Sequence, residues 1–282
     1  MSAAPRLAGV IGWPIGHSLS PNVHAYWAAR ENALAHYIPI TAAPDDASFR
    51  RVVEGLCAAG FRGLNVTVPH KERALRYADE ASDLARRVGA ANMLTFDGDR
   101  ARADNSDVEG FAEALRAAAP DGFNAARALV LGAGGAARAD AVALKTAFAA
   151  HVTVKNRTGS RADDLVAEGL ADAAAPWGSR NETQADVFVN ATSLGMEGSP
   201  PLDVDFAAAA PGAAAVDIVY RPLETAFLAN ARRAGLIAVD GLEMLLRQAV
   251  PGYLRWLGDA APVDNALREA IRARLTTGGA KA

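Results

Sequence analysis

The stretch Leu129-Val-Leu-Gly132-Ala133-Gly134-Gly135-Ala136-Ala-Arg138 places three glycines between an apolar run and a helix-like pattern. Glycines here allow a tight turn, and they let a pyrophosphate approach the first N–H groups of the helix, where the dipole favours anions. The spacing follows Gly-x-Gly-x-x-Gly/Ala, with Ala137 in the third place. We therefore predict a dinucleotide-binding turn made by Gly132, Ala133, Gly134, Gly135 and Ala136.

The segment after the following strand indicates which dinucleotide binds. NAD-binding folds carry an acidic residue about 20 residues further on, which holds the ribose diol. The stretch Asn156-Arg157-Thr158-Gly-Ser-Arg161 contains no carboxylate. Its two arginines offer paired donors to a 2′-phosphate, and Thr158 adds a hydroxyl, although Thr158 could also serve only as a helix N-cap. The sequence favours NADP over NAD.

Composition narrows the class of protein. The chain has 282 residues, 51% of them hydrophobic, and a formal net charge of −3, so it carries no basic field for nucleic acid or an anionic membrane. A single cysteine, Cys57, excludes an internal disulfide and a Cys-rich zinc site. The longest apolar runs are shorter than the roughly 20 residues of a membrane span, and the first residues lack the order of a secretory signal. We expect a cytoplasmic globular protein without a metal centre.

Apolar runs of strand length alternate with helix-like stretches, which predicts two α/β domains with mainly parallel sheets. The expected strands are Arg6–Ile11, His36–Ile40, Gly63–Val66, Asn92–Phe96, Ala128–Leu131, His151–Val154, Asp186–Val189, Ala215–Val219 and Leu236–Val239. The expected helices are Pro21–Glu31, Asp46–Ala59, Lys71–Arg87, Glu109–Ala118, Gly135–Ala149, Leu242–Leu257 and Val263–Leu275. The turn-like Pro120-Asp-Gly122 is a plausible domain boundary, and the tail could pack on either domain.

Polar motifs follow the expected strands of the first half, where open α/β sheets bind ligands. Ser18 and Ser20 could bind a carboxylate, although Ser20 before Pro21 also suits a helix N-cap. Lys71 falls near the start of a helix, an unfavourable place for a cation. With Asp107, itself a possible N-cap, it would make a pair suited to proton transfer during reduction of a carbonyl. Asn92 can donate to and accept from hydroxyls.

These motifs occur in an order that resembles the shikimate dehydrogenase family along nearly the whole chain. The matching stretches are Gly16–Pro21, Asn65–Lys71, Gly89–Leu94, Asp104–Asp107, Gly132–Arg138, Asn156–Thr158, Asn190–Met196, Asp217–Tyr220 and Asp240–Gln248. The chain departs from the usual family pattern at Met93, which stands where Thr is common, and this leaves substrate preference open.

The resemblance implies an NADP-dependent enzyme that reversibly reduces 3-dehydroshikimate to shikimate in chorismate and aromatic amino-acid biosynthesis. It implies a substrate domain of residues 1–106 and 241–282, to which the C-terminal helices return, and a Rossmann-like doubly wound NADP domain of residues 107–240. Lys71 and Asp107 would be the catalytic pair. The substrate residues would be Ser18, Ser20 and Tyr220 at the carboxylate, and Thr67, Asn92, Asp107 and Gln248 at the ring hydroxyls. Residues lining the nicotinamide side would be Thr192, Ser193, Ile218, Gly241 and Met244, with Asp83 as a further cofactor contact.

Three alternatives remain open at this point. A quinate/shikimate dehydrogenase using NAD would need more room near the serine pair for the extra hydroxyl of quinate. A paralogue could act on an amino-substituted shikimate. A nucleotide-sensing protein without turnover would have no need of Lys71 and Asp107. Both a monomer and a homodimer are compatible with the sequence.

Overall fold

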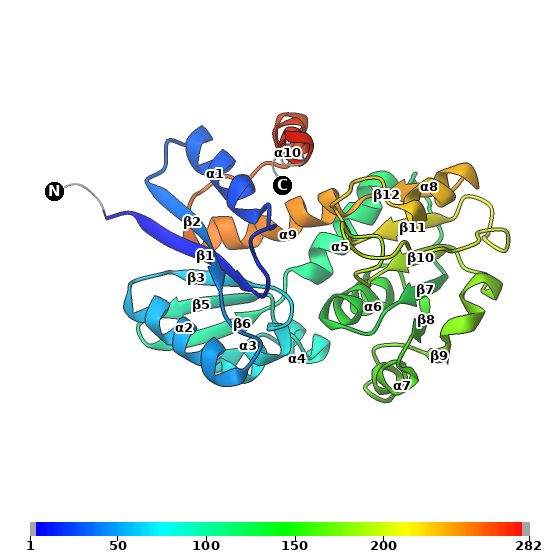
Figure 1. Ribbon diagram of the computed structural model, residues 1–282, viewed down its shortest axis with the longest axis horizontal. Helices are drawn as coiled ribbons and strands as arrows, with labels where there is room; N and C mark the ends of the chain where they lie inside the picture. Colours follow the sequence, from blue (N-terminus) through cyan, green and yellow to red (C-terminus); the bar gives the residue numbers. More distant parts are fainter. Residues whose placement is uncertain (1–3, 278–282) are drawn as a thin grey trace. The chain divides into compact units, whose positions relative to one another are not determined.

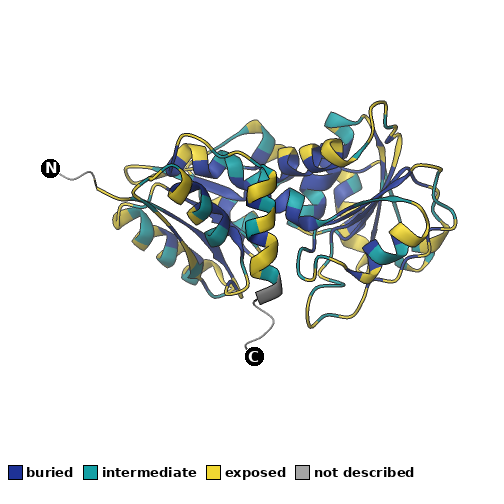
Figure 2. Ribbon diagram, turned by 90° about the horizontal axis from the view of Figure 1, so that it is seen from above, coloured by how far each residue is buried: buried dark blue, intermediate teal, exposed yellow. Residues whose placement is uncertain are grey.

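The computed structural model describes residues 4–277, which form two compact units (Figure 1). Of the described residues, one unit contains 4–106 together with 248–277, and the other contains 107–247. Helix α9 (Gly241–Trp256) therefore begins in the second unit and ends in the first. Each unit contains one six-stranded sheet whose strands are largely buried, whereas the helices carry the exposed residues on their outer faces (Figure 2).

The first unit is built on a mixed sheet. Its strand order is β2 (Ala35–Thr41), β1 (Arg6–Gly12), β3 (Gly63–Val66), β5 (Met93–Asp97), β6 (Arg100–Asp104) and β4 (Glu80–Ala81). The expectation of a mainly parallel sheet is met in this unit with one exception, β5, which runs antiparallel to both β3 and β6. The turn between β5 and β6 contains Gly98 at φ +62°, a left-handed conformation that glycine adopts without strain.

Helices cover both faces of this sheet. They are α1 (Ser20–Arg30), α2 (Asp46–Ala58), α3 (Lys71–Tyr77), α4 (Asp83–Val88), the end of α9 and α10 (Asn265–Thr277). On one face Phe49, Ala74 and Ala85, from α2, α3 and α4, pack against strand residues such as Leu64 and Val66. The single helix predicted over Lys71–Arg87 is wrong. The chain becomes extended at Ala78, β4 pairs with β6, and the Ser82 hydroxyl caps a new helix by accepting from Ala85 N at 3.1 Å.

The other face of this sheet requires a glycine where α9 lies against it. A Cβ on Gly63 would lie 2.3 Å from two ring atoms of Trp256 and 2.6 Å from the Leu94 carbonyl oxygen. Trp256 is only 1% exposed, and its Nε1 donates to Thr95 Oγ1 at 3.0 Å. Gly63 therefore allows the tail to pack closely on the first unit.

We expect Gly63→Ala to lower the free energy of unfolding by about 1–3 kcal/mol, because overpacking would displace Trp256. Urea unfolding of the full chain measures this. Gly55→Ala on α2 is the matched control, since its added Cβ meets nothing within 4 Å and alanine is the better helix former by up to about 1 kcal/mol. Equal stability of the two variants would contradict this account of the packing.

The second unit is an open parallel sheet. Its strand order is β12 (Ile237–Val239), β11 (Ala214–Asp217), β10 (Val187–Asn190), β7 (Arg127–Leu131), β8 (His151–Asn156) and β9 (Ala173–Pro176). Read from β9, this is the order 3-2-1-4-5-6 of a doubly wound dinucleotide-binding fold, with its switch point between β7 and β10. The other elements are α5 (Asp107–Ala118), α6 (Gly135–Ala147), α7 (Gly159–Ala167), the 3₁₀ helix η1 (Trp177–Glu182) and α8 (Ala226–Arg233).

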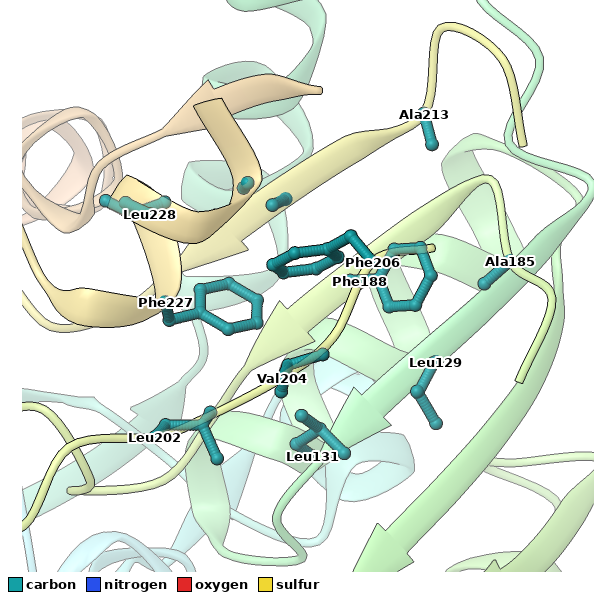
Figure 3. Packing of buried hydrophobic residues seen from close by; sticks show 12 residues of the cluster. Leu129, Leu131, Ala185, Phe188, Leu202, Val204, Phe206, Ala213, Phe227 and Leu228 are labelled. Atoms are coloured by element: carbon teal, nitrogen blue, oxygen red, sulfur yellow. The ribbon is translucent and has the colours of Figure 1, made fainter. Parts of the chain in front are cut away.

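Aromatic packing fixes one side of this sheet. Phe206 meets Phe188 and Phe227 edge-on, with ring centroids 5.2 and 5.3 Å apart, and Phe227 belongs to α8 (Figure 3). Phe206 belongs to the connection between β10 and β11, so this apolar cluster also anchors that long segment. The strands that carry the predicted cofactor loops are thereby held in a close-packed core.

Candidate functional site

The predicted substrate residues of the first unit gather at one edge of its sheet. Thr67 follows the end of β3, and Asn92 precedes β5, which runs in the opposite direction. Val66 N donates to Asn92 O at 2.8 Å, and Asn92 N donates to Asp104 O at 3.1 Å. The ends of β3 and β6 and the start of β5 therefore lie side by side, and α3 begins there with the half-buried Lys71.

Asn92 is the centre of a buried hydrogen-bond network. It is 3% exposed; its Oδ1 accepts from Ser106 N at 2.8 Å, and its Nδ2 donates to Ser106 Oγ at 3.0 Å. Nδ2 also lies 3.4 Å from Gln248 Oε1, and Ser106 Oγ donates to Gln248 O at 2.8 Å. The structure therefore brings Gln248, on α9, next to Asn92 and confirms that the C-terminal helices return to the first unit.

Two buried side chains support Asn92 from within the sheet. Asn65 Nδ2 donates to Asn92 O at 3.2 Å, and Tyr37 OH donates to Asn65 Oδ1 at 2.7 Å. Sequence reasoning did not single out Asn65 or Tyr37 for this role. The available signal was an amide inside the otherwise apolar strand Gly63–Val66, because a buried amide needs partners.

The serine pair differs in detail from the prediction. Ser20 is the first residue of α1, and the N-cap position belongs to Leu19, whose side chain makes no capping bond. Ser18 Oγ accepts a hydrogen bond from Ser20 N at 3.3 Å. Ser18 is half-buried and Ser20 is 6% exposed. Ser18 therefore lies just before α1, and Ser20 begins it.

The remaining predicted residues are divided between the units. Asp107, 4% exposed, is the first residue of α5 rather than its N-cap, and it belongs to the second unit, as does the half-buried Tyr220. Asp83 begins α4 in the first unit, where its exposed carboxylate accepts from Arg86 at 3.3 Å. Met93 is 1% exposed and fills the core beside Asn92.

The glycine turn of the second unit has the features that a dinucleotide needs. Gly132 has φ +117°, and a Cβ there would lie 2.7 Å from Ala191 O, so only glycine fits. A Cβ on Gly134 would meet nothing within 4 Å, so this side of the turn is open. Gly134 is the N-cap of α6, and neither a capping side chain nor an acidic residue of the first turn competes for its free N–H groups. The turn therefore fits a pyrophosphate.

The loop after β8 is equally suited to a 2′-phosphate. Arg157, Thr158 and Arg161 are exposed, and neither guanidinium is paired with a carboxylate within residues 4–277. Thr158 occupies the N-cap position of α7, but its hydroxyl makes no capping bond. Asn156 Nδ2 donates to Thr158 O at 2.9 Å and holds the loop. The loop therefore presents two cations and a hydroxyl, and α7 has no acidic residue in its first turn.

Lys155 lies behind this loop and does not take part in it. The side chain is buried, and its Nζ donates to Ser179 O at 2.6 Å and also to Thr183 Oγ1. Burial lowers the pKa of this amine. The lysine therefore attaches η1 to β8 and fixes the strand from which the arginine loop leaves.

The residues predicted on the nicotinamide side lie beyond the switch point. Thr192 and Ser193 follow β10, and Ile218 follows β11. Gly241 begins α9, where a Cβ would lie 2.5 Å from Ile218 O, and Met244 is buried one turn further on. These positions belong to the half of a doubly wound sheet that takes the second mononucleotide.

Comparison with known proteins agrees with this architecture. The model of the shikimate dehydrogenase substrate binding domain matches residues 10–94. The chain is 50% identical over 280 residues to the shikimate dehydrogenase (NADP(+)) of Acidiphilium cryptum, covering 98% of this chain and 99% of that protein. The chain belongs to the shikimate dehydrogenase family.

Solved structures of this family share the whole fold. The shikimate 5-dehydrogenase of Thermus thermophilus, in complex with NADP(H) and shikimate, is 36% identical with a TM-score of 0.83, over 95% of this chain and 99% of that one. The quinate dehydrogenase of Corynebacterium glutamicum, in complex with NAD, is 28% identical with a TM-score of 0.82, over 95% and 99%. The Thermus shikimate enzyme and the Corynebacterium quinate enzyme are thus nearly equal in fold similarity to this chain, and the Thermus enzyme has the higher sequence identity.

Two further findings describe what the chain contains. In the described part of the chain, no helix is both long and apolar enough to cross a membrane. Within residues 4–277, the His, Cys, Asp and Glu side chains form no group of three or more that could hold a metal ion.

Proposed function

We propose that this protein is an NADP-dependent shikimate dehydrogenase that reversibly reduces 3-dehydroshikimate to shikimate in chorismate and aromatic amino-acid biosynthesis. The observation that carries the proposal is the 50% identity with the Acidiphilium enzyme across 98% of this chain. The proposal assigns most of the substrate residues to the first unit and most of the cofactor residues to the second. It includes a cytoplasmic location and is compatible with a monomer or a homodimer.

The second unit would hold NADP through its two loops. The turn from Gly132 to Ala136 would bind the pyrophosphate through its free N–H groups. Arg157, Thr158 and Arg161 would bind the 2′-phosphate, and Asn156 would keep that loop in shape. When bound, the cofactor supplies or accepts the hydride. Its nicotinamide side would meet Thr192, Ser193, Ile218, Gly241 and Met244, with Asp83 as an additional contact.

The substrate is a carboxylate with several ring hydroxyls. Ser18, Ser20 and Tyr220 would bind the carboxylate. Thr67, Asn92, Asp107 and Gln248 would bind the hydroxyls, where an ill-fitting ligand would leave buried polar groups unpaired. Asn92 is well prepared for this role, since its hydrogen bonds to Ser106 fix its orientation before any ligand arrives.

Lys71 and Asp107 would carry the proton transfer. In the reduction direction, Lys71 Nζ gives a proton to the substrate oxygen as negative charge develops on it. In the oxidation direction the same amine takes that proton from the hydroxyl. Asp107 would hydrogen-bond the reacting hydroxyl.

The reduction direction tests the proposal directly. Purified protein mixed with 3-dehydroshikimate and NADPH should oxidise the NADPH, which is followed by the fall in absorbance of the reduced nicotinamide. The product should be shikimate, identified by chromatography against a standard. Consumption of NADPH without shikimate would indicate another substrate. No consumption by folded protein that binds NADPH would favour the nucleotide-sensing or amino-shikimate alternative.

A further inference from the structure

Two buried polar side chains occupy the carboxyl ends of adjacent strands in the second unit. Asn190 ends β10 and Asp217 ends β11; both are 0% exposed and lie opposite each other in the parallel pair. Asn190 Nδ2 donates to Asp217 Oδ1 at 2.9 Å. Burying an amide and a carboxylate costs free energy unless both find partners, and here they partner each other.

Asn190 organises the loop that follows β10. Its Oδ1 accepts from Thr192 N at 3.1 Å and from Thr192 Oγ1 at 2.7 Å, and its Nδ2 also donates to Leu194 O at 3.0 Å. The Thr192 hydroxyl in turn accepts from Leu194 N at 3.0 Å. One amide therefore fixes the backbone at both ends of the segment from Thr192 to Leu194.

Asp217 does the same for the loop that follows β11. Its Oδ1 also accepts from Val219 N at 2.9 Å, and its Oδ2 accepts from Thr225 Oγ1 at 2.6 Å. Thr225 caps α8 by accepting from Leu228 N at 3.2 Å. Burial raises the pKa of Asp217 to about 6. The carboxylate is thus attached at once to a neighbouring strand, its own loop and a helix N-terminus.

Both loops leave the sheet beyond its switch point. In this strand order, β7 and β8 serve the adenosine half of a dinucleotide, whereas β10 and β11 serve the other half. We propose that Asn190 and Asp217 are positioning residues that hold the Thr192–Leu194 and Ile218–Val219 loops in one register, so that the nicotinamide half of NADP binds in a single orientation. This inference rests on the proposed function.

A purely structural role would give a different result. If the network only stabilised the unit, breaking it would lower the affinity of the unit for all of its ligands to the same degree. If the network positions the nicotinamide half, breaking it should instead affect NADP much more than a ligand that lacks the nicotinamide. Adenosine 2′,5′-bisphosphate contains the 2′-phosphate and lacks the nicotinamide. It should therefore bind a variant with a broken network as tightly as it binds the wild-type protein.

The test is Asn190→Ala, measured by NADP kinetics and by calorimetric titration with adenosine 2′,5′-bisphosphate. We expect kcat/KM for NADP to fall roughly tenfold or more, the effect of a misplaced reacting group. The Kd of the bisphosphate should stay within about twofold. Asp186→Ala is the matched control: Asp186 precedes β10 at the opposite end of the strand and pairs with Arg127 at 3.1 Å, so its loss perturbs the same strand without touching either loop. The control variant should keep the wild-type kcat/KM for NADP and the wild-type Kd for the bisphosphate.

Asp217→Asn provides a second, milder variant if Asn190→Ala does not fold. Its amide oxygen can still accept from Asn190 and Val219, while the Thr225 hydroxyl loses its acceptor. We expect a two- to tenfold loss in kcat/KM for NADP, the range for one hydrogen bond, with the bisphosphate unaffected. The proposal would be overturned if kcat/KM for NADP and the affinity for the bisphosphate fell together, or if the NADP kinetics did not change. Either result would leave the proposed dehydrogenase function intact. A wild-type protein that did not bind the bisphosphate would instead overturn the NADP assignment and this inference with it.

Discussion

Lys71→Ala is expected to lower kcat about a hundredfold or more, because proton transfer to the substrate oxygen loses its donor; this is the lower range for general acid–base assistance. Lys71 is the first residue of α3, where a cation gains nothing from the helix dipole. A lysine at this position is therefore better explained by chemistry than by helix stability. Asp107→Asn should lower kcat to a similar degree, since it removes the charge while keeping the shape of the side chain.

Initial rates with saturating shikimate and NADP measure both variants. Lys145→Ala is the control: this lysine lies on α6 in the second unit, and its Nζ pairs with Asp172 at 2.6 Å. It should keep wild-type kcat and lose at most about 1 kcal/mol of stability. Adenosine 2′,5′-bisphosphate should bind all three variants equally. Near-normal turnover of both Lys71→Ala and Asp107→Asn would contradict the proposed roles.

The double variant Arg157→Ser, Arg161→Ser is expected to lower kcat/KM for NADP about a hundredfold. Each charge-assisted hydrogen bond to phosphate contributes about 1.5–3 kcal/mol, and each 1.4 kcal/mol corresponds to a factor of ten. The exposure of both side chains places the expected loss at the lower end of that range. Activity with NAD, which has no 2′-phosphate, should change less than threefold or so, by the same reasoning.

The control for this variant makes the same change of charge elsewhere in the second unit. Arg232 and Arg233 lie at the end of α8, where Arg232 pairs with Glu224. Their replacement by serine should leave the ratio of NADP to NAD activity unchanged. An equal loss with both cofactors in the Arg157, Arg161 variant would show that the loop acts through long-range charge rather than by recognising the 2′-phosphate.

Local chemistry made the glycine turn after β7 and the exposed arginines after β8 predictable. Gly132 must adopt φ +117° against the Ala191 carbonyl, a requirement that glycine alone meets. The absence of a carboxylate after β8 is likewise visible in the sequence, and the structure leaves Arg157 and Arg161 exposed there. Both signals lie within a few residues of the feature that they predict.

Long-range contacts were not predictable from local pattern. Gln248 lies 3.4 Å from Asn92 across 156 residues of sequence, and only the resemblance to a family placed it in the first domain. The strand β6 was missed because its buried face consists of Ala101 and Ala103, which alternate with exposed arginines and give a weak apolar signal. Sheet pairing with β6 also breaks the helix expected over Lys71–Arg87, which shows tertiary contacts prevailing over helical periodicity.

The hydrogen-bonded pair of Asn190 and Asp217 could be predicted from the sequence only in part. Asn190 and Asp217 end otherwise apolar strands, so each is recognisable as a buried polar residue in need of a partner. That they partner each other follows from the adjacency of β10 and β11, which the sequence does not state. Their hydrogen bonds to two separate loops become visible only in the folded unit.

The most direct test of the central claim is a set of initial rates on the purified wild-type protein, with shikimate and quinate each paired with NADP and NAD. The account predicts rapid reduction of NADP by shikimate, with much slower rates for the three other pairs. A preference for quinate would contradict the role assigned to Ser18 and Ser20. A preference for NAD would contradict the role assigned to Arg157 and Arg161. Absence of turnover with all four pairs, in folded protein, would contradict the account as a whole.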